Sequence, residues 1–141
     1  MTDQGLVYAL LVGIDAYQSP WPALAGCGND VTEAEAVLRT LVQDRLRLKV
    51  LRDGEATRKR VMAEFTTHLG QAGPDDVAFF WFSGHGSDEP VAAEHWHLEP
   101  TGRSQTLVCV DSRHQGVADL SDKTLSAMID LVAESGAHVA V

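Results

Sequence analysis

The feature that most constrains the fold is an uninterrupted apolar run near the start of the chain, from Leu6 to Gly13. A strand with one face in solvent alternates apolar and polar residues, whereas a strand covered on both faces is apolar throughout. This run therefore predicts a central strand of a parallel sheet. Residues 76–82, which include four consecutive aromatic side chains, predict a second buried strand whose aromatic residues form core on both faces.

The segments between the predicted strands have helical periodicity. One helix is predicted after the turn at residues 26–29, where Asp30 and Glu33 have the spacing of a capping box. Two more helices are predicted to begin after Thr57 and Ser121, which are typical N-cap residues. The apolar residues expected on the buried face of the first helix are Val31, Ala34, Leu38, Leu41 and Val42.

Three shorter strands complete the predicted order, at residues 46–51, 106–110 and 138–141. Residues 87–104 have no clear periodicity and are predicted to be irregular. Strands that alternate with helices form right-handed crossover units. The sequence therefore predicts the α/β class, as a three-layer α/β/α sandwich around a mostly parallel sheet.

Composition excludes several classes of protein. The 141 residues fit one domain, and an apolar share of 45% with a charged share of 22% is ordinary for a globular chain. Twenty acidic residues against 11 basic ones give a net charge of -9, which argues against nucleic acid as a partner. No apolar run is long enough to span a membrane, and Asp3 stands where a secretory signal would carry a basic residue. Two cysteines cannot form a disulfide framework, so a cytoplasmic location is expected.

The strongest candidate for chemistry is the sequence from Ser83 to Gly86, which follows the second buried strand. Ligands of open α/β sheets bind beyond the carboxyl ends of the strands. His85 could act there as a general acid or base, and Gly86 could offer a backbone N–H to a developing oxyanion. The alternative is a histidine in a turn with no chemical role.

Three segments in the same order resemble the caspase-like cysteine peptidases, and they are most similar to the metacaspase and bacterial orthocaspase branch. The segments are residues 8–15 (YALLVGID), 24–31 (LAGCGNDV) and 79–87 (FFWFSGHGS), with the helix that starts at Thr57-Arg58-Lys59 between the last two. The similarity runs from about residue 7 to the end of the chain and loosens between residues 88 and 104. The resemblance implies a caspase-like fold and a thiol protease that acts as a cysteine-type endopeptidase on protein or peptide substrates.

The resemblance also implies roles for individual residues. His85 matches the catalytic histidine of the His/Cys dyad, and Gly86 matches the residue whose N–H helps to form the oxyanion hole. Asp30 matches an acidic residue at the base of the S1 pocket, which selects Arg or Lys at the cleaved position, as a carboxylate suits a guanidinium or ammonium group. The alternative for Asp30 is a helix N-cap, and both roles are compatible.

The nucleophile implied by the resemblance is not in this sequence. In the family it follows the strand that begins here at His138, so it is expected just beyond Val141. Residues 1–141 are then the N-terminal portion of a caspase-like catalytic domain, incomplete at its C-terminus and inactive alone, and further domains or subunits are possible. Cys27 matches a non-catalytic family position, and Cys109 is expected to be an inert buried thiol.

No cofactor is expected, although calcium activates metacaspases. Asp111 matches one aspartate of that family, and Asp122 could match the first of a paired-aspartate site, but Lys123 stands at the second position. A lysine opposes the oxygen-rich shell that calcium requires.

Two alternatives from other classes remain open. One is a non-catalytic caspase-like module that acts through protein interactions, which predicts no cysteine shortly after Val141. The other is metal-dependent hydrolysis, in which His95 and His97 would join His85 at a zinc ion. The region around His95 and His97, flanked by Glu94 and Glu99, is more simply a solvated loop.

Overall fold

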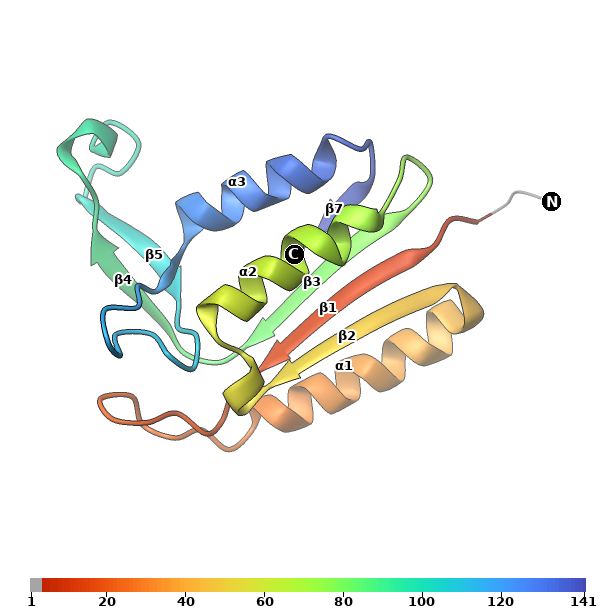
Figure 1. Ribbon diagram of the computed structural model, residues 1–141, viewed down its shortest axis with the longest axis horizontal. Helices are drawn as coiled ribbons and strands as arrows, with labels where there is room; N and C mark the ends of the chain where they lie inside the picture. The colour runs from red at the N-terminus through yellow and green to blue at the C-terminus, as the bar shows by residue number, and fades with distance from the viewer. Residues whose placement is uncertain (1–3) are drawn as a thin grey trace.

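The computed structural model describes residues 4–141, which form two β-sheets and three α-helices (Figure 1). The main sheet is parallel throughout and has the strand order β2-β1-β3-β7. Its strands are β1 (Val7–Gly13), β2 (Leu46–Arg52), β3 (Val77–Ser83) and β7 (His138–Ala140). The two strands with the longest apolar runs, β1 and β3, are neighbours in the middle of the sheet, as their composition predicts.

Helices cover both faces of the main sheet, so the predicted three-layer α/β/α arrangement is confirmed. Helix α1 (Cys27–Val42) lies on one face, and helices α2 (Arg58–Thr67) and α3 (Asp122–Ala133) lie on the other (Figure 1). The Phe65 ring of α2 packs against the Phe80 ring of β3, with ring centroids 5.1 Å apart. Short 3₁₀ turns occur at Gln43–Arg45, Asp53–Glu55, Leu69–Gln71 and Ala93–His95.

The two faces of β3 are buried to different degrees. Phe80, on the α2 and α3 side, is buried in the main core, whereas Trp81, on the α1 side, is 39% exposed. Leu41 of α1 is 71% exposed. The prediction that the aromatic residues of β3 form core on both faces is therefore wrong for the α1 side, as is the prediction that Leu41 is buried. The single helix on this side leaves part of β3 uncovered.

The second sheet corrects two predictions. It is antiparallel, with the order β4-β5-β6, and consists of β4 (Gly86–Pro90), β5 (Arg103–Leu107) and β6 (Leu120–Ser121). Residues 87–104, predicted to be irregular, contain most of strand β4 and the start of strand β5, and the strand predicted at 106–110 lies at 103–107. The β4 sequence, GSDEP, contains residue types that are depleted in strands, so local propensity does not reveal it. Pairing with β5 supplies the hydrogen bonds that stabilise it.

The capping-box prediction for the first helix is also wrong. Helix α1 begins at Cys27, three residues before Asp30, and its N-cap, Gly26, makes no side-chain hydrogen bond. The Asp15 carboxylate accepts hydrogen bonds from the backbone N–H groups of Cys27 and Gly28, both at 2.9 Å. The Asp15 carboxylate, from the loop after β1, thus satisfies backbone N–H groups that a side chain at the N-cap would otherwise bind.

The predicted caps of the other two helices are confirmed, because the Thr57 and Ser121 hydroxyls accept hydrogen bonds from residues three positions later. None of the helices within residues 4–141 combines the length and apolar character needed to cross a membrane.

Candidate active site

The candidate site lies at the carboxyl edge of the main sheet, where β1 and β3 end side by side. Gly13 and Ser83, the last residues of these strands, are partners in the parallel register, and the Ile14 N–H donates to the Ser83 carbonyl at 3.0 Å. The loop at residues 14–26 therefore meets the segment 83–86. Of the two, the segment 83–86 is the one that the sequence indicates as the strongest candidate for chemistry.

His85 is half-buried, and a main-chain carbonyl holds its ring. Its Nε2 atom lies 2.7 Å from the carbonyl oxygen of Pro22. Because a carbonyl oxygen can only accept a hydrogen bond, this contact requires the proton on Nε2. In the neutral ring Nδ1 is then the unprotonated nitrogen, which is the atom that can accept a proton from a nucleophile.

Two aromatic side chains from the loop at residues 14–26 pack around the His85 ring. The ring centroid of Tyr17 lies 4.7 Å from that of His85, and the centroid of Trp21 lies 5.8 Å from it. Trp21 donates its indole N–H to the Ser112 carbonyl at 3.3 Å, and the Arg113 guanidinium stacks over its ring at 4.8 Å. The segment after β5 thus supports the aromatic side chains that contact His85.

Gly86 starts β4 opposite Leu107 of β5. The Val108 N–H donates to the His85 carbonyl at 3.0 Å, so the next pair along, Gly86 and Leu107, is a non-hydrogen-bonded pair. The N–H groups of such a pair point away from the partner strand, and β4 is an edge strand. The Gly86 N–H therefore points off the open edge of the sheet.

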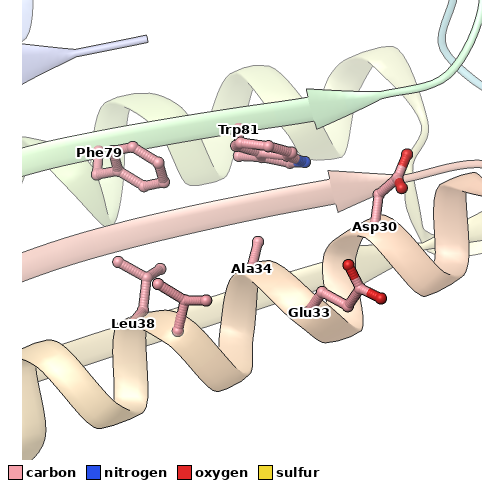
Figure 2. Close-up of a pocket in the computed structure, with 7 residues that line it drawn as sticks. Asp30, Glu33, Ala34, Leu38, Phe79 and Trp81 are labelled. Carbon is pink, nitrogen blue, oxygen red and sulfur yellow. The ribbon is translucent and has the colours of Figure 1, made fainter.

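Asp30 lies in the first turn of α1, exposed to solvent. Its Oδ2 accepts a hydrogen bond of 2.8 Å from the Ser83 hydroxyl, which joins α1 to the end of β3. With Glu33 it forms the acidic end of a groove of about 340 Å³ between α1 and β3, and Figure 2 shows both carboxylates at that end. The rest of the groove is apolar, lined by Ala34, Val37, Leu38, Phe79 and Trp81.

Both cysteines of the chain are buried and reduced. Burial raises the pKa of the Cys27 thiol, which lies at the start of α1 close to Ser83 and Asp15. Burial also raises the pKa of Cys109, to about 12. Because the thiolate is the nucleophilic form, neither sulfur is suited to attack a substrate near neutral pH.

The residues around Asp122 do not fit calcium. The Lys123 ammonium donates to Glu99 and to both oxygens of Asp122, where a divalent cation would need free oxygen ligands. Burial opposes the charged form of Asp122, but hydrogen bonds from Ser104 and Lys123 outweigh it and lower the pKa. Asp111 is also engaged, because its carboxylate accepts the Arg58 N–H at 2.8 Å.

Nothing in residues 4–141 assembles a metal site from three or more His, Cys, Asp or Glu side chains. The His95 ring lies 3.6 Å from the carboxylate of the neighbouring Glu94, and both side chains are well exposed. The histidine pair considered as a zinc site is thus not joined by a third ligand in the described part of the chain.

Sequence reasoning missed four residues of the site: Tyr17, Trp21, Pro22 and Ser83, whose hydroxyl binds Asp30. Ser83 belongs to the motif that was singled out, but its contact with Asp30 spans 53 positions and leaves no local pattern. Pro22 contributes only a main-chain oxygen, which every residue has. Tyr17 stands near the carboxyl end of a predicted buried strand, and this position was the one available signal.

Comparisons with known proteins agree with this architecture. A family model described as metacaspase, peptidase C14 domain, matches residues 8–140. Metacaspase-1 from Plasmodium falciparum (isolate 3D7) is 31% identical over 118 residues, which are 77% of this chain and 19% of that protein. The crystal structure of protein GSU0716 from Geobacter sulfurreducens superposes with a TM-score of 0.74 at 22% identity, over 95% of this chain and 48% of that one. The chain thus spans about a fifth of the first relative and about half of the second.

Proposed function

Since the chain belongs to the metacaspase family of C14 peptidases, we propose that it carries the histidine half of a cysteine endopeptidase site that cleaves after Arg or Lys. The observation that carries this proposal is the fixed ring of His85, whose Nε2 is bound to the Pro22 carbonyl while Nδ1 remains available. The resemblance inferred from three short motifs is confirmed at the level of the family and of the fold.

The proposed reaction is an acyl transfer in two steps. A cysteine thiolate forms a bond to the scissile carbonyl carbon, while the imidazolium of His85 gives its proton to the leaving amine. Water, deprotonated by the neutral ring, then displaces the thiolate from the acyl group. The outward N–H of Gly86 supports a role in binding the oxyanion in both steps.

We place the nucleophile outside the 141 residues, a few positions beyond Val141. The support is the burial of Cys27 and Cys109 and their raised pKa values. Residues 1–141 are then the N-terminal portion of a catalytic domain and do not cleave peptides alone. The two reduced, buried thiols are also compatible with the cytoplasmic location proposed for the protein.

Asp30 is the proposed selector of basic residues at the cleaved position. Its carboxylate is exposed, carries no cationic partner among the described residues and is held by the Ser83 hydroxyl. A free carboxylate held in one orientation can accept hydrogen bonds from a guanidinium or an ammonium group. Its position beside Ser83, two residues before His85, supports a site for the side chain of the cleaved residue.

The complete reading frame, assayed with peptides that carry Arg, Lys or Asp at the cleaved position, tests the activity. We expect cleavage after Arg and Lys, and a fall in kcat of about 10²- to 10⁴-fold for His85→Ala. A wild-type protein that cleaves none of the peptides, or that has no cysteine after Val141, would contradict the proposal and favour a non-catalytic interaction module.

Selectivity is tested separately with Asp30→Asn and with Glu33→Gln as the matched control. Glu33 lines the same groove but has no hydrogen bond to Ser83. We expect kcat/KM for basic peptides to fall by about a hundredfold in the first variant and to change little in the second. An unchanged preference in Asp30→Asn would refute the assignment.

We further propose that Lys123 makes this chain independent of calcium at the Asp122 position. Its ammonium group supplies the positive charge that links Asp122 to Glu99. Calorimetric titration of the chain with calcium should give no binding at this position. Lys123→Asp, which restores a paired aspartate, should gain binding, and binding by the wild-type chain that Asp122→Asn abolishes would overturn the proposal.

A further inference from the structure

The hydroxyl group of Tyr17 stands inside the junction between the two sheets. Tyr17 is only 7% exposed, and its Oη accepts a hydrogen bond of 3.0 Å from the His85 backbone N–H. The same hydroxyl donates to the Val108 carbonyl at 2.7 Å. Burial raises the pKa of Tyr17 above its ordinary value, so the hydroxyl keeps the proton that it donates.

These two bonds replace one direct bond of the antiparallel ladder. In a regular hydrogen-bonded pair, His85 and Val108 would exchange two backbone bonds. One is present, from the Val108 N–H to the His85 carbonyl at 3.0 Å. The other, from the His85 N–H to the Val108 carbonyl, is replaced by two bonds to the Tyr17 hydroxyl oxygen, which lies between the two groups.

The glycine before His85 is required for this arrangement. A Cβ atom at position 84 would lie 2.5 Å from the Tyr17 hydroxyl oxygen, closer than carbon and oxygen approach without a bond. Gly84 therefore lets a side chain from the loop after β1 reach the backbone between β3 and β4. The Tyr17 ring then packs against the imidazole, with centroids 4.7 Å apart.

We propose that Tyr17 is a positioning residue of the peptidase site, which holds the main chain and the ring of His85 so that Nε2 stays on the Pro22 carbonyl. This inference rests on the role proposed for His85. The hydroxyl fixes the backbone from which the imidazole projects, the ring restricts its rotation, and Pro22 fixes its tautomer. All three contacts come from the loop at residues 14–26, so this loop presents the histidine as one unit.

Nuclear magnetic resonance of the 141-residue chain tests the proposal without any peptidase activity. The variant is Tyr17→Phe, and the matched control is Tyr8→Phe, whose ring packs on His68 instead. We expect the Nε2–H tautomer of His85 in the wild type and in the control. In Tyr17→Phe we expect a mixture of tautomers and a His85 amide that exchanges with solvent at least tenfold faster.

An unchanged tautomer together with an unchanged amide exchange rate in Tyr17→Phe would overturn the proposal, as would a wild-type Nδ1–H tautomer. If Tyr17→Phe does not fold, the proposal is tested by measuring hydrogen exchange in the wild type. A Tyr17 hydroxyl proton that is protected from exchange and close to the His85 amide supports the role, and a rapidly exchanging one contradicts it.

The complete reading frame gives the second readout. Tyr17→Phe should lower kcat by about ten- to a hundredfold with KM little changed, because a small displacement of the acid–base group affects the chemical step. Equal effects of Tyr17→Phe and Tyr8→Phe would overturn the role. A wild-type protein without activity would contradict the proposed function alone, since the tautomer of His85 still decides the role of Tyr17.

Discussion

The two sides of the candidate site are built differently. His85 is held by the Pro22 carbonyl, by two aromatic rings and by the Tyr17 hydroxyl on its backbone. Asp30 is exposed and has one side-chain partner among residues 4–141, the Ser83 hydroxyl. A group that transfers protons needs one geometry, whereas a carboxylate that binds a ligand needs free acceptor positions. The difference predicts that substitutions on the histidine side affect stability more than those on the Asp30 side.

The largest effect is expected for Gly84→Ala. The added Cβ would lie 2.5 Å from the Tyr17 hydroxyl and 3.0 Å from the Phe82 ring, both of which are packed. Overpacking of this kind costs about 1–3 kcal/mol of unfolding free energy, which urea titration would measure. Gly86→Ala is the control, because its nearest new contact is 3.6 Å away. Equal stabilities of the two variants would show that the junction is not tightly packed.

A loss of about 1–3 kcal/mol is also expected for Asp119→Asn. The Asp119 carboxylate is buried, accepts the Thr106 hydroxyl at 2.9 Å and pairs with Arg113 at 2.8 Å. Arg113 in turn stacks on Trp21, so the pair supports the ring beside His85. The control is Asp88→Asn, which breaks an exposed pair with Arg103 and should change the urea midpoint little. Similar losses of unfolding free energy in both variants would contradict the distinction between the buried Asp119 pair and the exposed Asp88 pair.

A smaller and pH-dependent effect is expected on the Asp30 side, for Asp15→Asn. The backbone N–H groups of Gly28 and Cys27 lower the pKa of Asp15 from its ordinary value of 3.8. Its stabilisation is therefore present above about pH 4 and is lost as the pH falls through the lowered value. Thermal unfolding of the wild type and the variant should differ by a few degrees at pH 7 and converge in acid. A difference in unfolding temperature that does not depend on pH would show that the charged Asp15 carboxylate is not the source of the stabilisation.

The smallest effect on stability is expected for Ser83→Ala. It removes one exposed hydrogen bond, to Asp30, so the unfolding free energy should change by less than about 0.5 kcal/mol. If Asp30 selects basic residues, KM for peptides with Arg at the cleaved position should rise in the complete protein, while kcat remains close to wild type. A large loss of stability would show that the Asp30 side is as tightly built as the histidine side.

The main sheet could be predicted because its signals are local. Each signal lies within roughly one helix or strand length of sequence. These signals are the apolar runs of β1 and β3, the helical spacing of α1, α2 and α3, and the hydroxyl caps at Thr57 and Ser121. The second sheet could not be predicted, because β4 contains glycine, proline and acidic residues and forms only through pairing with β5. The cap of α1 was missed for the same reason, since Asp15 lies 12 and 13 positions before the groups that it binds.

By itself, the sequence determined the α/β class, the order of the main elements, the family, and His85, Gly86 and Asp30 as the residues to consider. It could do so because burial on both faces of a strand and short motifs in a set order constrain nearby residues. Only the tertiary structure decided how those residues are held: Nε2 of His85 on Pro22, Asp30 on Ser83, and Tyr17 between His85 and Val108. These contacts join residues 53 to 91 positions apart, and such pairs become neighbours only when the parallel strands align their carboxyl ends.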